Sequence, residues 1–152
     1  MIEFDYKGIR ISATAEISRH DFKDANNIGR TRFNRNVKVR VSFWSFDIYD
    51  DLYELSMVKS TLTYFMQAFW KRSSKLGAKI ELATSLEHQF PKQTLSFIAR
   101  QKNNNHSLEI TLTENAQQID CVYFSGQEVI MLDVGISKVI ALLMPQTLEI
   151  ND

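Results

Sequence analysis

Apolar and polar residues alternate over two stretches in the first half of the chain. The first stretch covers residues 2–17, interrupted at Gly8, and the second covers residues 37–43. A period of two is typical of a strand that buries one face and exposes the other. The pattern predicts one or two antiparallel strands before residue 18, and a further strand from Val37 that runs on toward Phe46.

Between these stretches, residues 19–36 show no periodicity. Asp24, Asn26, Asn27, Gly29 and Asn34 all favour turns. A segment of this composition has no repeating apolar face to bury. We therefore expect a long polar loop or mobile arm.

A helical period follows the second stretch. Asp50 or Asp51 is placed to cap the start of the helix, and Gly77 follows a basic last turn, as the helix dipole and the left-handed C-cap favour. The spacing predicts a helix of about 25 residues. Its apolar stripe consists of Leu52, Leu55, Val58, Leu62, Phe65 and Phe69.

The second half returns to alternation. Strands are predicted around residues 80–82 and at residues 95–99, 108–112 and 119–124. A polar hairpin loop at residues 102–106 separates the middle two. The second half is therefore predicted to have four strands followed by a helix.

The last helix has a clear start and stop. Ser125 and Glu128 have the spacing of a capping box, with Phe124 and Val129 placed as its hydrophobic staple. The helix is apolar nearly all round, so we expect it to be buried on more than one side. Pro145 should end it.

These elements predict one domain over residues 1–152, in the α+β class. We expect antiparallel sheets with two main helices packed on them. The first half has two or three strands and then a helix, and the second half has the order β-β-β-β-α. With only 2 Pro and 5 Gly, no linker divides the halves, whose shared order suggests a decayed β-α duplication.

Charge and cysteine content limit the class of protein. Lys plus Arg and Asp plus Glu both number 18, so the net charge is zero. A domain that binds nucleic acid is usually basic, and the overall charge of this chain gives no support for such a partner. The single cysteine, Cys121, suits a reducing cytoplasm. The longest apolar run is broken by Asp133 and Lys138 and is too short to span a bilayer. We expect a cytoplasmic protein with no membrane partner.

The sharpest local feature is a basic window, residues 25–46, which holds no Asp or Glu. Cations beside exposed aromatic rings are what single-stranded DNA or RNA needs, because phosphates carry charge and bases have flat faces. The alternative is a solvated strand face, balanced by the acidic residues that follow. The candidate nucleic-acid-binding residues are Arg30, Arg32, Phe33, Arg35, Lys38, Arg40 and Trp44.

The long helix carries a second apolar set beside its main stripe. One sheet covers only one face of a helix, so a second face usually meets another helix or another subunit. Packing against the last helix and a homodimer interface are both open. The residues of this set are Tyr53, Met57, Tyr64, Met66 and Trp70.

No other pattern indicates catalysis or a cofactor. The acidic residues from Asp47 to Glu54 lack the spacing of a calcium loop and suit a helix start. His20, His88 and His106 are scattered, with no partner at ligand spacing, and are expected in surface loops. We expect no catalytic residue, no metal site and no cofactor.

Two β-rich halves, each closed by a helix, give an element order that resembles the Whirly and PC4-like single-strand binders. The resemblance implies sheets that present bases to aromatic side chains, and helices that form a dimer. From the residues themselves, abundant apolar helix surface without a recognisable site favours a non-enzymatic protein-binding module, such as an adaptor, inhibitor or immunity-type protein. A single-stranded nucleic-acid-binding protein that uses residues 30–46 is the alternative, and a small enzyme of unknown class is the second alternative.

Overall fold

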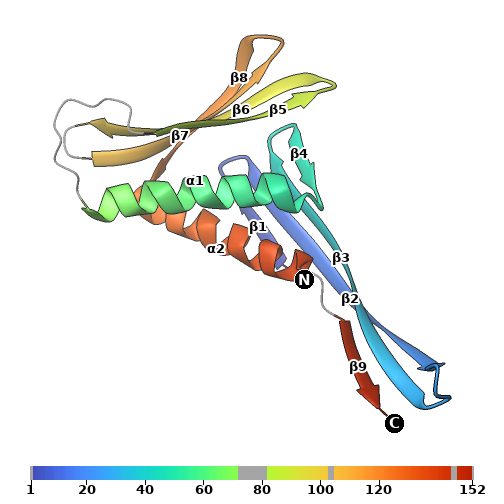
Figure 1. The fold of residues 1–152 in the computed structure, drawn as a ribbon. Helices are drawn as coiled ribbons and strands as arrows, with labels where there is room; N and C mark the ends of the chain where they lie inside the picture. Colours follow the sequence, from blue (N-terminus) through green and yellow to red (C-terminus); the bar gives the residue numbers. More distant parts are fainter. Residues whose placement is uncertain (1, 72–81, 103–104, 145–146, 152) are drawn as a thin grey trace.

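A computed structural model describes residues 2–71, 82–102, 105–144 and 147–151 (Figure 1). Two antiparallel sheets and two helices make up the fold, so the α+β class is confirmed. The first half consists of β1 (Ile2–Tyr6), β2 (Ile9–Lys23), β3 (Gly29–Phe43), β4 (Phe46–Tyr49) and α1 (Leu52–Lys71). The second half consists of β5 (Leu82–Gln89), β6 (Lys92–Lys102), β7 (Asn105–Glu114), β8 (Gln117–Ser125) and α2 (Gly126–Leu143), and β9 (Thr147–Asn151) follows.

Both halves have four strands and then a helix. The predicted order of the second half is confirmed, whereas the first half has one strand more than the two or three expected. The extra strand is β4, which is only four residues long. Trp44 adopts a positive φ of 56° and reverses the chain after Phe43, so the expected single strand toward Phe46 is a hairpin.

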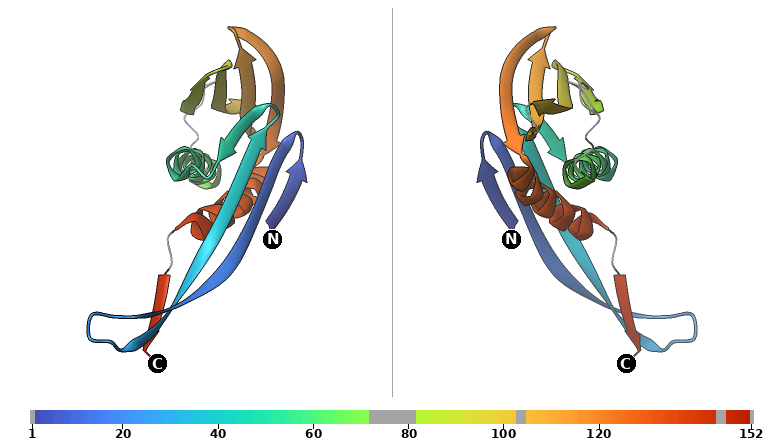
Figure 2. Two further views of the ribbon diagram at one scale, coloured as in Figure 1. Left: turned by 90° about the vertical axis from the view of Figure 1, so that its right-hand side faces the viewer. Right: turned by 90° about the vertical axis from the view of Figure 1, so that its left-hand side faces the viewer.

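The prediction of a long loop at residues 19–36 was wrong, because all of these residues except the turn at 24–28 belong to β2 or β3. Strands β2 and β3 pair without interruption from Ile9 opposite Phe43 to Lys23 opposite Gly29. Their far ends form a two-stranded arm that extends away from the helices (Figures 1 and 2). Both faces of the arm lie outside the core, so its sequence needs no apolar alternation. The Asp24 carboxylate closes the turn by accepting hydrogen bonds from the Asn26 and Ile28 amides.

Helix α1 buries the middle of the predicted stripe, whereas Leu52 at its start is 39% exposed and the side chain of Phe69 lies outside the described residues. Leu55, Val58, Leu62 and Phe65 are all at most 1% exposed. Asp51 caps the helix, since its carboxylate accepts a hydrogen bond of 3.0 Å from the Glu54 amide. The predicted end at Gly77 lies outside the described residues.

Helix α2 begins at the predicted capping box. The Ser125 hydroxyl accepts a hydrogen bond from the Glu128 amide (3.3 Å), and the Glu128 carboxylate accepts one from the Ser125 amide (3.0 Å). The helix then packs on the sheet of the other half. A Cβ atom on Gly135 would lie 2.8 Å from Ile11 of β2, so the glycine permits this close approach.

The two halves share one core. Helix α2 contacts α1, the strands β1 to β3 of the first sheet, and β7 and β8 of the second. Buried residues from both sheets and both helices form a single cluster. Residues of β1 to β4 with β9 make the first sheet, and residues of β5 to β8 make the second sheet. Neither described helix is long and apolar enough to cross a membrane.

Candidate functional site

One face of the first sheet carries most of the cations of the predicted basic window. Side chains alternate between the two faces of a strand. Val39 and Val41 of β3 are buried beneath the helices, so the even-numbered residues of β3 point the other way. We call the side away from the helices the outer face of the first sheet. From β3 it includes Arg30, Arg32, Lys38, Arg40 and Ser42.

The neighbouring strand adds a cation that sequence reasoning missed. Arg10 of β2 lies opposite Ser42, and Ser12 lies opposite Arg40. These residues line a hollow of about 640 Å³ on the outer face. The pairing register, unknown from the sequence, brings Arg10 and Arg40 into the same hollow. Its complete lining is Glu3, Phe4, Asp5, Gly8, Arg10, Ile11, Ser12, Arg40, Ser42 and Trp44.

Trp44 belongs to the lining of this hollow. Its indole lies directly against Gly8, where a Cβ atom would come within 2.3 Å of the indole Nε1. Gly8 also has a positive φ of 84°, which glycine adopts without steric cost. The Trp44 amide donates a hydrogen bond of 3.0 Å to the Gly8 carbonyl. The β1–β2 turn therefore holds the tryptophan ring in place while leaving it partly exposed.

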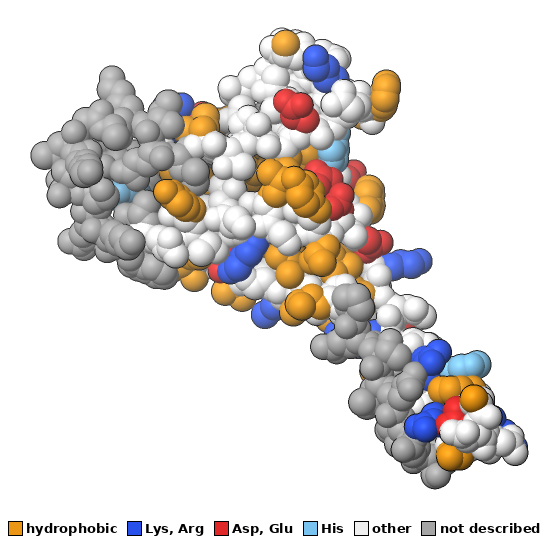
Figure 3. All heavy atoms as spheres, in the orientation of Figure 1, with side chains coloured by type: hydrophobic (Ala, Val, Ile, Leu, Met, Phe, Trp, Pro, Cys, Tyr) orange, Lys and Arg blue, Asp and Glu red, His pale blue; other side chains and the backbone are white. Residues whose placement is uncertain are grey.

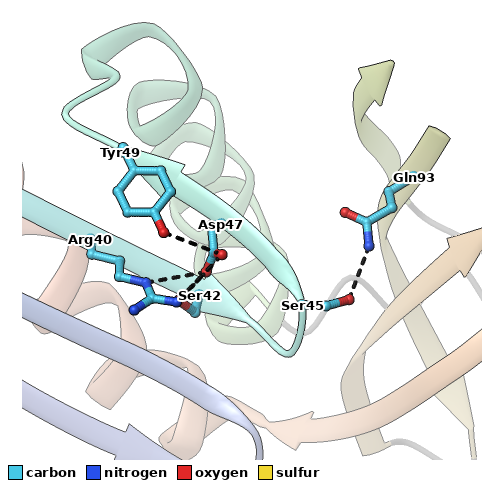
Figure 4. A network of polar contacts seen from close by, with 6 residues as sticks. All are labelled: Arg40, Ser42, Ser45, Asp47, Tyr49 and Gln93. Carbon is cyan, nitrogen blue, oxygen red and sulfur yellow. Dashed lines mark hydrogen bonds and ion pairs between the residues drawn. The ribbon is translucent and has the colours of Figure 1, made fainter. Parts of the chain in front are cut away.

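A polar network around Asp47 positions Arg40 and Tyr49 (Figure 4). Asp47 Oδ1 lies 3.3 Å from Nη2 of Arg40 and accepts a hydrogen bond of 2.5 Å from the Ser42 hydroxyl. The Tyr49 hydroxyl donates to Asp47 over 3.4 Å, and the Arg40 guanidinium lies 5.5 Å from the centre of the Tyr49 ring. The Tyr49 ring is 59% exposed, so the network presents a cation and an aromatic face together to solvent.

A second group of cations and rings lies on the arm. The Arg32 guanidinium lies 4.8 Å from the centre of the Phe22 ring, and the His20 ring stacks on Phe22 at 6.0 Å. Arg30 is held by Asp24, with 2.6 Å between Nε and Oδ2. These contacts place His20 and Phe22 of β2 on the same face as Arg30 and Arg32 of β3. The outer face thus carries cations and rings along the length of β3.

The structure divides the predicted set of residues. Phe33 and Arg35 are odd-numbered positions of β3, and they lie on the opposite face from Arg32 and Lys38. Phe33 lies opposite Leu148 of β9 in the sheet. The seven candidate residues therefore do not share one surface, because neighbouring side chains of a strand point to opposite faces.

The second apolar set of α1 is also divided. Tyr53 and Tyr64 are 74% and 58% exposed, and with Met57 they line a shallow groove of about 350 Å³ beside Thr84 of β5. Figure 3 shows hydrophobic side chains gathered over α1 on this side. Met66 is 9% exposed and belongs to the core, so its assignment to an interface was wrong. The side chain of Trp70 lies outside the described residues.

The sequence predicted that the three histidines lie in surface loops, and this prediction was wrong because all three lie in strands. His20 is in β2, and His106 is buried in β7. His88 of β5 stacks on Phe46 at 3.8 Å, and its Nε2 lies 3.1 Å from Glu54 Oε2. Burial raises the pKa of the Glu54 carboxyl above its usual value. These contacts join the second sheet to the start of α1.

Within the described part of the chain, no group of three or more His, Cys, Asp or Glu side chains could hold a metal ion. A scan against protein-family models finds no match, and a search of curated proteins finds no significant similarity. The candidate site is therefore described by its own geometry.

Proposed function

We propose that the chain binds single-stranded nucleic acid on the outer face of the first sheet. The observation that carries the proposal is the row of Arg10, Arg30, Arg32, Lys38 and Arg40 on two paired strands, next to exposed aromatic rings. Guanidinium and ammonium groups neutralise phosphates, and rings stack on bases of any sequence. The hollow between Gly8 and Arg40 gives a nucleotide room to approach the backbone.

The face suits a single strand better than a duplex. Rings on a sheet surface can stack only on bases that are already unstacked from a partner strand. Carboxylates such as Asp47 and Asp24 hold guanidinium groups in position while leaving part of each group exposed. A fixed guanidinium loses less conformational entropy when it meets a phosphate. The cytoplasm is the compartment we propose for this activity, in line with the single cysteine.

Fluorescence anisotropy with labelled single strands at two salt concentrations tests the proposal. The logarithm of the affinity should fall with the logarithm of salt concentration by about 0.7 per phosphate contacted. Arg40→Ala and Lys38→Ala should each reduce this slope by about 0.7. Lys92→Ala removes an exposed cation from the second sheet and serves as the matched control, with no expected change. Nonspecific binding to nucleic acid has dissociation constants of about 1–100 μM. Absence of binding at about 10 μM protein would therefore refute the proposal.

A protein-binding module is the second candidate function, favoured by the groove on α1. Tyrosine and methionine are enriched where proteins meet, and Tyr53, Met57 and Tyr64 are exposed or half-buried along one groove. A photo-crosslinker placed at Ser60, within this groove, should then capture a partner protein. The same crosslinker at the exposed Ser85 of the second sheet is the control.

A further inference from the structure

One row of directly opposed residues crosses the hollow on the outer face of the first sheet. Glu3 of β1 lies opposite Ser12 of β2, and Ser12 lies opposite Arg40 of β3. Directly opposed residues share a face of the sheet. Because neighbouring strands lie about 4.8 Å apart, the backbones at Glu3 and Arg40 are separated by about 10 Å, with only a serine between them. The hollow therefore has a carboxylate on one side and a guanidinium on the other.

The Glu3 carboxylate has no partner in the fold. The residue is exposed, and none of the described residues forms a hydrogen bond or an ion pair with it. The neighbouring carboxylates are engaged, since Asp5 lies 3.5 Å from Arg10 and Asp47 lies 3.3 Å from Arg40. An ionised carboxylate only accepts hydrogen bonds. A ligand that fills the hollow must therefore present hydrogen-bond donors to Glu3 and negative charge to Arg40.

A nucleotide of a single strand has both kinds of group. Its phosphate is repelled by Glu3 and attracted by Arg40, so the phosphate backbone should follow β3, where Lys38 continues the row of cations. The base then extends across β2 toward β1. The Trp44 indole belongs to the same lining and offers a flat surface on which a base can stack. At about 640 Å³, the hollow is also within the range of about 300–1,000 Å³ that is usual for small-ligand sites.

We propose that the hollow is a guanine subsite, in which the Glu3 carboxylate selects guanine from the other bases. The Watson–Crick edge of guanine has two adjacent donors, N1–H and the amino group on C2, which match the two oxygens of a carboxylate. Adenine and cytosine have an acceptor nitrogen beside their amino group, and thymine and uracil have a carbonyl on each side of N3–H. Each of these bases would set a lone pair against the second carboxylate oxygen. The subsite rests on the proposed function, because it is part of the face that binds the strand.

Anisotropy titrations with single-stranded DNA of about nine nucleotides test the subsite. The strands are oligo(dT), unchanged or with guanine, adenine, cytosine or hypoxanthine at the central position. The guanine strand should bind at least about fivefold more tightly than the thymine, adenine and cytosine strands, since a bidentate contact discriminates by about this factor or more. Hypoxanthine lacks the amino group on C2, so its strand should lose most of this preference.

A pair of variants tests the role of the carboxylate. Glu3→Gln should bind the guanine and thymine strands with equal affinity, because the amide places a donor where a carboxylate oxygen accepted. Glu16→Gln is the matched control and should keep the preference. It removes the same charge from an exposed position of the outer face, opposite Asn36 and outside the lining of the hollow.

The outcomes separate the subsite from the proposed function. Equal affinities for all five strands in the unmodified chain overturn the guanine subsite while the proposed function stands. A preference for guanine that survives Glu3→Gln also overturns it. Absence of binding to every strand refutes the proposed function and the subsite together.

Discussion

The outer faces of the two sheets differ in chemistry, although β1 to β4 and β5 to β8 are each paired in chain order. The first sheet presents Arg10, Lys38 and Arg40 around a hollow. The centre of the second sheet presents hydroxyl groups, with Ser96 opposite Thr111 and Thr94 opposite Thr113. This face also carries the ion pair of Arg100 with Glu109, and no tryptophan lies on it among the described residues. It has the solvated surface that any half-buried antiparallel sheet needs.

The two sheets also differ at their turns. The β3–β4 turn carries Trp44, which lies against Gly8, whereas the corresponding β7–β8 turn carries Asn115 and Ala116. All four turn residues have positive φ. Inward-facing positions of both sheets serve the same core, so the fold tolerates either set of outward residues. Core packing therefore does not explain the cations and rings on the outer face of the first sheet.

The largest effect should come from breaking the contact between Gly8 and Trp44. Gly8→Val forces a β-branched residue into a positive φ and its side chain into the indole. We expect a loss of at least about 2 kcal/mol of unfolding free energy, from overpacking and backbone strain together. Urea denaturation measures the loss. Ala116→Gly in the second sheet is the opposite change at a φ of 65° and should be neutral or stabilising. Equal destabilisation by both variants would contradict this view of Gly8.

Two tyrosines allow a direct comparison of the faces. Tyr49 of β4 and Tyr123 of β8 are 59% and 56% exposed, each near the end of the fourth strand of its sheet. Tyr49→Ala should weaken binding of a single strand by about 1–3 kcal/mol if one base stacks there. Tyr123→Ala should leave the affinity unchanged. Anisotropy titrations of both variants at one salt concentration decide the question, and an equal loss would spread the binding surface over both sheets.

A smaller effect is expected from Glu128, whose ionisation should make the unfolding free energy depend on pH. It forms the capping box, accepts a hydrogen bond from the Tyr6 hydroxyl and lies 2.8 Å from the Lys7 ammonium, which lowers its pKa to about 2. Its usual pKa is 4.5, so the stabilisation is present above that value and disappears as the pH falls toward 2. Allowing for solvent screening, we expect about 1–2 kcal/mol.

Denaturation of Glu128→Gln across pH 2–7 checks this expectation, since the variant should lose that part of the pH dependence. Glu109 of the second sheet, 2.5 Å from Arg100, provides the comparison. Glu109→Gln breaks a partly exposed pair on the surface and should cost less than about 1 kcal/mol. A pH profile of Glu128→Gln identical to that of the unmodified chain would show that the carboxylate does not anchor β1 to α2.

The amino-acid sequence by itself determined the elements whose signal is local. The stripe of α1 and the capping box of α2 follow from spacing within a few residues, because a helix is stabilised by near neighbours. The alternation at residues 37–43 placed a strand correctly, since one face of it is buried. It could not reveal the arm, where neither face of β2 or β3 enters the core and no alternation is required.

Only the tertiary structure decided which side chains meet. Arg10 and Arg40 are 30 positions apart, and the register of β2 with β3 brings them to one hollow. The same register sends Phe33 and Arg35 to the other face. Met66 belongs to the core because α1 packs against α2, and α2 reaches the first sheet because Gly135 lets it approach Ile11. The local pattern of the sequence predicts which face of an element is apolar. Strand pairing and helix packing between residues far apart in the sequence determine what covers that face.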